Sequence, residues 1–327
     1  MNLIDAYRYL AALEQHRHFG RAAAACHITQ PALSNALRSL ETHLGVAIVR
    51  RSRQYEGLTA EGEQVLATAH RVLREQEALQ QALAGTVEQP QGRLLVAAVP
   101  TAVPVAARFV ARLVALHPGL QPQLRALASP DIDAGLDSLA IDLGLGYLDR
   151  LPSTGRARPD TWPQYAEHHY LLAHHAGQPG GLGAPLAWAE AAAAPLALLT
   201  PEMHHRALVD EAFRRVGVAV QPRLECSSVT ALLAAVQTGT LQAVLPGAVV
   251  ATVAGQAGWL ARPLQAPVVH TPMGFMAAAG ARRSRALDAA LRLAEAPAWQ
   301  AELARHSGAL GGGFGLVSGA NEAPGRS

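Results

Sequence analysis

Two neighbouring segments near the start of the chain carry apolar residues at helical spacing. In the second segment a stripe of leucines recurs every three or four positions, formed by Leu33, Leu37, Leu40 and Leu44. Thr29 precedes this segment as a good N-cap residue, and Pro31 falls in the first turn, where its missing N–H is harmless. Ala22 and Ala23 in the first segment are small enough for two helices to cross closely. The pattern predicts a helix-turn-helix.

Beyond residue 93 the pattern changes to short apolar runs that alternate with amphipathic stretches. The runs predict strands at residues 94–99, 121–127, 141–145, 170–173, 195–199 and 242–245. The stretches predict helices at residues 103–116, 131–139, 205–216 and 230–237. Because strand and helix alternate, we expect a parallel sheet with right-handed crossovers. Two α/β subdomains joined by crossing strands would enclose a ligand cleft.

Residues 60–85 form one continuous helical pattern between these two parts. Their apolar stripe advances in alternating steps of four and three, through Val65, Ala69, Val72, Gln76, Leu79 and Leu83. A helix outside a globular domain must bury such a stripe, and the same helix of a second subunit is the most economical partner. Packing against the chain's own C-terminal domain is the alternative. We expect a homodimer or homotetramer, and a break in the helix at residues 89–92.

The polar face of the predicted second helix suits DNA. It carries Gln30, Ser34, Asn35 and Arg38, whose amide, hydroxyl and guanidinium groups match base edges and phosphates. Residues 1–60 hold seven arginines and four acidic residues, and seven minus four leaves +3 in a chain whose formal net charge is +2. The small net charge excludes a uniformly basic nucleic-acid coat, while the local excess favours an N-terminal DNA interface.

This segment resembles the winged helix-turn-helix of the LysR-type transcriptional regulators. The family's pattern is matched at Phe19, Ala22, Ala23, Thr29, Gln30, Pro31, Ala32, Leu33, Ser34, Leu40, Glu41, Leu44 and Gly45. Further on, Arg50-Arg51 and Leu58-Thr59-x-x-Gly62 match its wing and the start of its next helix. Ile48 and Val49 stand where the family commonly has a Leu-Phe pair, a change that we expect to alter core packing alone.

The resemblance implies a regulator that binds double-stranded promoter DNA as an oligomer, with RNA polymerase as a further partner. The residues expected at the DNA are Thr29, Gln30, Pro31, Ser34, Asn35, Arg38, Arg51 and Arg53. The expected fold is α+β and multidomain. A winged helix-turn-helix covers residues 1–59, a linker helix residues 60–89, and a periplasmic-binding-protein-like (type 2) effector domain residues 93–305. Within that domain we expect subdomain I at residues 93–162 and 267–305 and subdomain II at 163–266, followed by a disordered Gly-rich tail, 306–327.

Candidate effector residues follow from the predicted sheet. Open parallel sheets bind ligands beyond the C-terminal ends of their strands, where helix N-termini present free N–H groups. The positions that meet this condition are Thr101 and Ala102, Ser129, and Thr200, Pro201 and Met203. Hydroxyls beside helix N-termini suit a small anion, commonly a carboxylate in this family, with Pro201 and Met203 as an apolar wall. The alternative is that Thr101 and Ser129 merely cap helices.

Other chemistries find little support in the sequence. There is no Gly-rich phosphate loop and no nucleophile elbow, so we expect neither an enzyme nor a cofactor. The pairs at residues 168–169, 174–175 and 204–205 are adjacent histidines, which in a strand point to opposite faces and do not chelate a metal. Cys26 and Cys226 are too few for a disulfide scaffold, although redox sensing by Cys226 stays open.

The start of the chain reads as an amphipathic helix and not as a signal peptide, and polar residues interrupt the longest apolar stretch, 231–254. We therefore expect a cytoplasmic protein without a membrane span. Two classes of function remain. One is an effector-responsive DNA-binding regulator, and the other is an α/β solute-binding or enzymatic protein that uses a fused helix-turn-helix for protein interaction. Salt-sensitive binding to a specific promoter fragment discriminates between them.

Overall fold

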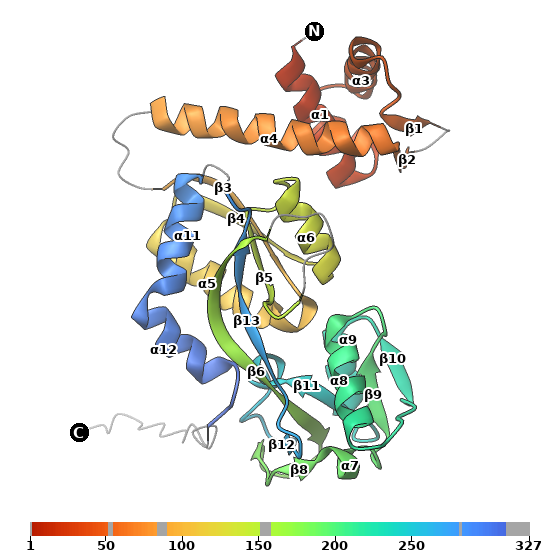
Figure 1. Cartoon of the computed structure of the whole chain (residues 1–327), viewed down its shortest axis with the longest axis vertical. Coiled ribbons are helices and arrows are strands. Elements are labelled where there is room, and N and C mark those ends of the chain that lie inside the picture. The colour runs from red at the N-terminus through yellow and green to blue at the C-terminus, as the bar shows by residue number, and fades with distance from the viewer. Residues whose placement is uncertain (1, 52–54, 84–89, 151–157, 281–282, 312–327) are drawn as a thin grey trace, which may run out of the picture.

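The computed structural model describes residues 2–51, 55–83, 90–150, 158–280 and 283–311. A small helical domain, one long helix and a larger α/β unit follow one another along the chain (Figure 1). The elements of the first two parts are α1 (Leu3–His16), α2 (Phe19–Ala25), α3 (Gln30–Leu44), β1 (Val49–Arg51), β2 (Tyr55–Leu58) and α4 (Ala60–Leu83). β1 and β2 pair antiparallel as a hairpin. In the described part of the chain no helix is both long and apolar enough to cross a membrane.

The leucine stripe of α3 forms the centre of the N-terminal core. Leu33, Leu37 and Leu40 are fully buried, as their spacing predicts. Leu44 is exposed instead, because it lies in the last turn before Gly45. Gly45 ends the helix in the left-handed conformation with φ 70°, which glycine adopts at no steric cost.

Side-chain hydrogen bonds tie the hairpin to the helices. The Glu41 carboxylate accepts from the N–H groups of Ile48 and Val49 at 3.0 and 3.1 Å. The Thr59 hydroxyl donates to the Ala47 carbonyl at 2.6 Å and accepts from the Gly62 N–H at 2.9 Å. A Cβ atom at Gly62 would lie 2.1 Å from the Ile48 carbonyl oxygen. The Leu-Glu and Leu-Thr-x-x-Gly signatures thus fix where the hairpin leaves α3 and enters α4.

The linker helix is partly covered by its own domain. Ala69 is fully buried, and Val65 and Val72 pack against the same apolar cluster as α1 and α3. Leu79, further along α4, has 53% of its surface exposed. The expectation that the whole stripe awaits a second subunit is therefore wrong for its first half, because α1 packs along that part of α4. The side chain of Leu83 lies outside the described residues.

The α/β unit contains one continuous sheet. Its strands are β3 (Gly92–Ala98), β4 (Leu120–Ala126), β5 (Leu143–Tyr147), β6 (Asp160–His174), β7 (Gly181–Leu182), β8 (Leu186–Ala187), β9 (Leu196–Leu199), β10 (Leu224–Cys226), β11 (Gln242–Pro246), β12 (Trp259–Gln265) and β13 (His270–Ala277). The order along the sheet is β10-β9-β11-β6-β13-β5-β3-β4, and β12 joins β6 together with β7 and β8.

The sheet is mixed, which corrects the expectation of a parallel one. β3, β4 and β5 are parallel to one another, and so are β9, β10 and β11. The long strand β6 and its neighbour β13 run antiparallel to each other, and β13 and β6 run antiparallel to β5 and β11 respectively. Both long strands therefore pass from one subdomain to the other (Figure 1). β6 carries the chain from the first subdomain into the second, and β13 carries it back.

Helices cover this sheet in two groups. They are the 3-10 turn η1 (Pro100–Ala102), α5 (Val103–Leu116), α6 (Ser129–Asp137), α7 (Trp188–Ala191), α8 (His204–Arg215), α9 (Val229–Gln237), α10 (Gly247–Val250), α11 (Arg285–Glu295) and α12 (Pro297–His306). In the core of the first subdomain, Phe109 of α5 contacts Phe275 of β13 and Trp299 of α12, with ring centroids 4.4 and 5.1 Å apart. A separate core surrounds Tyr170 and Leu245 in the other subdomain.

The predicted tail, 306–327, lies mostly outside the described residues. Its first part is packed: Leu310 is buried, and its N–H donates to the Tyr170 hydroxyl at 2.7 Å.

Candidate nucleic-acid interface and effector pocket

The predicted DNA-contacting face of α3 is open. Gln30, Asn35 and Arg38 are exposed and Ser34 is partly exposed, and their side chains form no hydrogen bond among the described residues. Thr29 is exposed too, and its hydroxyl accepts from the Ala32 N–H at 3.4 Å as the N-cap. The leucine stripe anchors the helix from behind, so these side chains are held on a rigid element.

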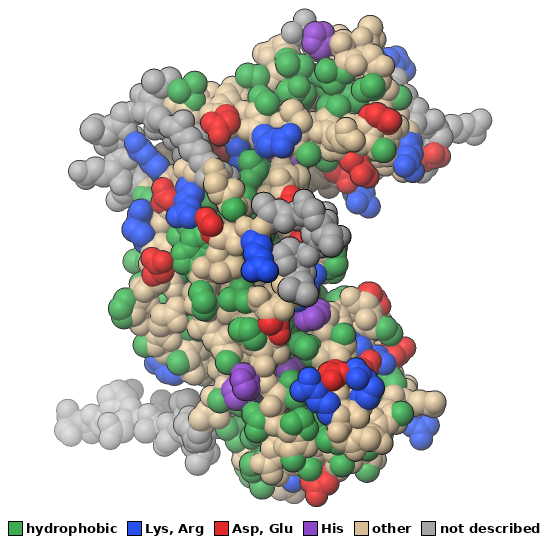
Figure 2. All heavy atoms as spheres, in the orientation of Figure 1, with side chains coloured by type: hydrophobic (Ala, Val, Ile, Leu, Met, Phe, Trp, Pro, Cys, Tyr) green, Lys and Arg blue, Asp and Glu red, His purple; other side chains and the backbone are tan. Residues whose placement is uncertain are grey.

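The remaining predicted DNA residues are described less fully. Pro31 is exposed in the first turn of α3. Arg51 ends strand β1, but its side chain lies outside the described residues, as does Arg53 altogether. In the view of Figure 2 basic and acidic side chains are interspersed over the N-terminal domain, so the local charge excess does not appear there as one continuous patch.

A second candidate site lies where three helix starts meet. The pocket is lined by Val99, Pro100, Thr101, Ala128, Ser129, Tyr147, Leu199, Met203, His204 and His205. Its volume is about 10 Å³, which is room for a single water molecule. The lining comes from η1, α6 and β5 on one side and from the end of β9 and the start of α8 on the other. The pocket is therefore shared between the two subdomains.

The structure brings together three of the six predicted effector residues. Thr101, Ser129 and Met203 line the pocket. Ala102 is instead fully buried in the core of the first subdomain. The turn after β9 directs Thr200 and Pro201 away, so that the Thr200 hydroxyl donates to the Glu202 carboxylate at 2.7 Å and Pro201 is exposed.

The two predicted hydroxyls do not cap helices. α6 has Ala128 as its N-cap residue, η1 has Val99, and neither helix has a side-chain cap hydrogen bond. Thr101 shares a 3.1 Å hydrogen bond with the Tyr147 hydroxyl instead. The Ser129 hydroxyl is buried without a partner in the described structure. Both groups are therefore placed for a ligand or a water molecule.

The sequence interpretation missed the histidines of this pocket. His205 is 4% exposed, and neither of its ring nitrogens has a partner among the described residues. Burial holds its pKa well below the usual range, and the nearby His169 and His204 act in the same direction. The His204 Nε2 atom is also buried and unpartnered, and its ring lies 4.5 Å from that of Tyr147.

The strand argument used for adjacent histidines does not apply to His204 and His205. The pair begins a helix, where neighbouring side chains are about 100° apart, so both can reach one cavity. In the described part of the chain no group of three or more His, Cys, Asp or Glu side chains is arranged to hold a metal ion. The position of the pair at a helix start was the signal that could have found it.

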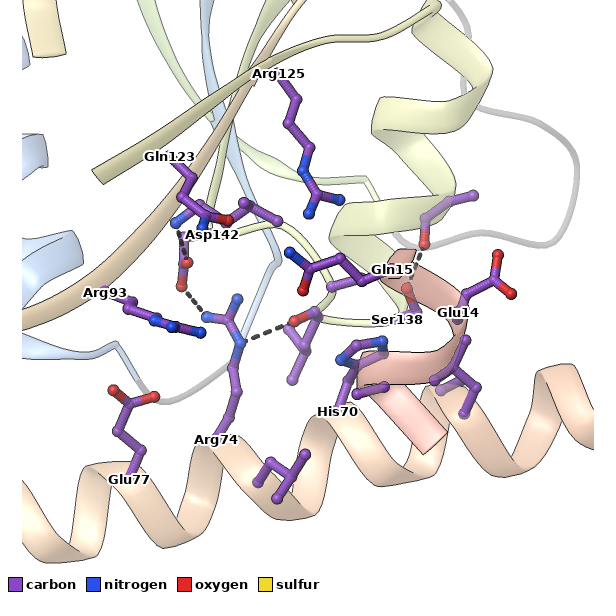
Figure 3. A pocket seen from close by; sticks show the side chains of 18 of the residues that line it. Glu14, Gln15, His70, Arg74, Glu77, Arg93, Gln123, Arg125, Ser138 and Asp142 are labelled. Carbon is purple, nitrogen blue, oxygen red and sulfur yellow. Dashed lines mark hydrogen bonds and ion pairs between the residues drawn. The ribbon is translucent and has the colours of Figure 1, made fainter. Parts of the chain in front are cut away.

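A third feature connects the linker helix with the α/β unit. A cavity of about 630 Å³ lies between α1, α4 and the first subdomain. Figure 3 shows Arg74 of α4 extending across it toward Asp142. The Arg74 guanidinium donates to the Leu139 carbonyl at 2.8 Å and forms an ion pair with Asp142. Asp142 also accepts from the Leu95 N–H at 2.6 Å. We call the contacts of Arg74 with Leu139 and Asp142 the latch.

Both charged side chains of the latch are largely removed from solvent. Asp142 is 11% exposed and Arg74 25%. Burial raises the pKa of Asp142, and Arg74 together with the Leu95 N–H opposes that rise. Beside them, burial and the charges of Arg74 and Arg125 lower the pKa of His70 to about 4. Leu139 has φ 59°, a left-handed backbone uncommon for leucine.

Both cysteines are free thiols. Burial raises the pKa of the Cys26 thiol. The Cys226 sulfur accepts from the Ser228 N–H at 3.3 Å within a local turn. Redox sensing by Cys226 stays a prediction.

Two family models match the chain. Residues 4–63 match the bacterial regulatory helix-turn-helix protein, lysR family, and residues 88–297 match the LysR substrate binding domain. The second match alone covers more than half of the chain.

Individual relatives match over shorter stretches. A hydrogen peroxide-inducible genes activator of Pectobacterium carotovorum is 40% identical over 101 residues, which are 31% of this chain and 33% of that protein. An SDS degradation transcriptional activation protein of a Pseudomonas species is 38% identical over 100 residues, again 31% and 33%. The chain thus matches about a third of the length of these relatives.

Solved structures match over nearly the whole chain. A full-length OxyR variant from Pseudomonas aeruginosa has a TM-score of 0.64 at 24% identity, covering 88% of this chain and 96% of that one. CbnR in complex with its target DNA has a TM-score of 0.61 at 19% identity, covering 88% and 97%. At these identities the likeness concerns the fold.

Proposed function

Because the chain belongs to the LysR family of bacterial regulatory helix-turn-helix proteins, we propose that it regulates transcription by binding promoter DNA and a small anionic effector. The observation that carries this proposal is the open face of α3. Its amide, hydroxyl and guanidinium groups have no partners among the described residues, and helices that carry such groups read base edges in the major groove. One of the matched solved structures, CbnR, is a complex with its target DNA.

The effector pocket supports the second half of the proposal. Two buried hydroxyls, the buried imidazole of His205 and the partly buried imidazole of His204 converge at helix N-termini, where N–H groups favour anions. We further infer that the protein acts as a homodimer or homotetramer, with RNA polymerase as a further partner. An oligomer places two copies of α3 on one DNA fragment, which raises the affinity without new contacts.

The test is binding of the full chain to the DNA upstream of its own gene and of neighbouring genes, measured by fluorescence anisotropy over a range of salt concentrations. We expect one fragment to bind much more tightly than shuffled DNA, with an affinity that falls as salt rises. The Gln30→Ala variant should lose about 1–3 kcal/mol of discrimination at one operator position.

Gln121→Ala is the matched control, because Gln121 is an exposed glutamine on β4, far along the chain from α3. It should bind like the unmodified protein. Equal affinity for all fragments would contradict the proposed function. An operator preference that Gln30→Ala leaves unchanged would contradict the placement of α3 in the groove.

A further inference from the structure

The effector pocket attracts negative charge but contains no cationic side chain. α6 begins at Ser129 and α8 at His204, and the positive ends of their dipoles point at the same small space. None of the ten lining residues is Lys or Arg. A carboxylate enclosed there would be buried without an opposite charge, which is costly. A group that becomes positive only when the anion arrives would remove this cost.

His205 has the properties of such a group. It is buried to 4% exposure on the wall of the pocket, with both ring nitrogens unpartnered among the described residues. A neutral imidazole has one donor and one acceptor nitrogen, and an imidazolium has two donors. Two open ring positions are therefore suited to the charged form facing a carboxylate. The unpartnered Ser129 hydroxyl lines the same pocket and can donate to the second carboxylate oxygen.

Burial, and after it the neighbouring histidines, disfavour the charged form of His205 in the absence of an anion. His169 of β6 has its ring 5.3 Å away and, with His204 of α8, disfavours a positive charge on His205. From the segment after β5, Arg150 disfavours a positive charge on His204 and Asp149 favours it, while Arg150 pairs with Asp133 at 3.2 Å.

Neither of the remaining neighbours supplies a compensating charge. Tyr147 is a buried phenol bonded to Thr101, and burial raises its pKa. Glu167 of β6 faces Tyr147, and burial raises its pKa to about 8, so that it is largely neutral near pH 7. An anion in the pocket is thus the one new charge that reverses the preference of His205.

We propose that this pocket binds a small carboxylate together with one proton, and that His205 takes up the proton from solvent as the carboxylate enters. This inference rests on the proposed effector site and specifies its ligand class. No bond other than N–H forms, and the complex carries an imidazolium paired with a carboxylate. The pocket as it stands has room for a single water molecule, so this proposal requires a carboxylate with few non-hydrogen atoms and a separation of the two subdomains as it enters.

The direction of the pH dependence follows from linkage. Without ligand the pKa of His205 lies well below its usual range, and the bound carboxylate raises it. His205 thus has a lower pKa in the ligand-free protein and a higher pKa in the complex. Between these two pKa values the affinity for the carboxylate falls about tenfold for each unit that the pH rises. Binding is therefore tighter at pH 6 than at pH 8, by about a hundredfold if both pH values lie inside that window.

The test is isothermal titration calorimetry of the full chain with acetate, nitrate and acetamide. Each titration is repeated in two buffers of different ionisation enthalpy, which counts protons, and over a series of pH values. We expect acetate and nitrate to bind with uptake of about one proton and the slope given by linkage. The neutral isostere acetamide should bind without proton uptake or not at all. Absence of saturable binding for both anions, or binding without proton uptake, overturns the proposal.

Variants identify the proton acceptor. His205→Asn cannot be protonated and should bind acetate with an affinity independent of pH. The exposed control His175→Asn should retain proton uptake, and His204→Asn tests whether the second imidazole of the pocket takes up the proton instead. Proton uptake that persists in His205→Asn, or that is lost in His204→Asn alone, overturns the assignment to His205. Should His205→Asn fail to fold, the proton count of the unmodified protein still decides the proposal. DNA binding is measured separately, so failure of this inference is distinct from failure of the proposed function.

Discussion

At the scale of single residues, one buried hydrogen bond lies in the wall of the pocket. Thr101 is 3% exposed, and its hydroxyl is bonded to that of Tyr147 at 3.1 Å. Thr240 forms a similar 2.8 Å bond with the Thr238 hydroxyl, but on the surface. Removing a partner from a buried group leaves that group unpaired, whereas water replaces the partner of an exposed one.

Thr101→Val should therefore destabilise the α/β unit by about 1–3 kcal/mol, while Thr240→Val should change its stability by less than about 0.5 kcal/mol. Urea unfolding followed by tryptophan fluorescence measures this difference, because all four tryptophans of the chain lie in the α/β unit. An equal loss of unfolding free energy in the two variants would mean that the Thr101–Tyr147 hydrogen bond does not stabilise the α/β unit. The variant also leaves the Tyr147 hydroxyl free, so acetate titration of Thr101→Val reports whether the ligand uses it.

Residues whose signals are local could be predicted from the sequence. Thr29, Pro31 and Gly45 mark the ends of α3 through capping and backbone preference, and Thr101 and Ser129 follow strands at the positions where ligands bind. The position of His205 in the pocket could not be predicted in the same way. It depends on where α8 begins and on which strand of the other subdomain faces it, and both are set by packing between distant segments.

At the scale of elements, the apolar stripe of the linker helix is packed in its first half and exposed further along. Val72 packs within the N-terminal domain, whereas Leu79 is 53% exposed. A charge at Val72 would disturb the chain's own core, so Leu79 is the position that tests association. The heptad-like spacing indicated an amphipathic helix correctly, but spacing alone does not say which part of the stripe a neighbouring helix covers.

Leu79→Asp should weaken subunit association, because it places a charge in an apolar seam between two copies of α4. Sedimentation velocity should show a shift toward monomer, and the operator affinity should fall because two half-sites are no longer bound together. Gln80→Asp, at the adjacent exposed position of α4, carries the same charge away from the stripe and should leave the assembly unchanged. An intact oligomer in Leu79→Asp would place the interface elsewhere.

The strands show the same division between local and non-local information. The runs at residues 94–99 and 242–245 predicted β3 and β11 closely. Their alternation with helices suggested a parallel sheet, yet β13, which pairs antiparallel with β5 and β6, was not among the predicted strands. Strand direction across a subdomain boundary is decided by chain return over more than a hundred residues, and no local pattern encodes it.

At the scale of the whole molecule, two elements join the effector pocket to the latch. α6 begins at Ser129 in the pocket and ends just before Leu139 of the latch. β5 begins just after Asp142 and ends at Tyr147 in the pocket. We expect a ligand that contacts Ser129 and His205 to displace α6, and with it the end of the helix beside Leu139. We expect the latch to pass this displacement to α4, and through α4 to α3.

Arg74→Ala should uncouple the two sites. In the unmodified protein we expect acetate to change operator affinity by about fivefold or more, a usual size for coupling between sites. Without the latch this ratio should approach one, while acetate still binds the pocket with proton uptake. Arg71→Ala is the matched control, because Arg71 lies on the same helix, is exposed, and donates to Thr68 of that helix at 3.0 Å.

Anisotropy titrations of operator DNA with and without acetate, on the three proteins, measure the coupling ratio directly. Arg74→Ala should also lose stability, because it leaves the buried Asp142 carboxylate without its cationic partner. Burial already raises the pKa of Asp142. Asp142→Asn combined with Arg74→Ala removes that charge and separates the two effects. If the double variant is as stable as the unmodified protein and still lacks coupling, the latch transmits the signal. If Arg74→Ala responds to acetate as fully as Arg71→Ala, the signal reaches α4 by another route.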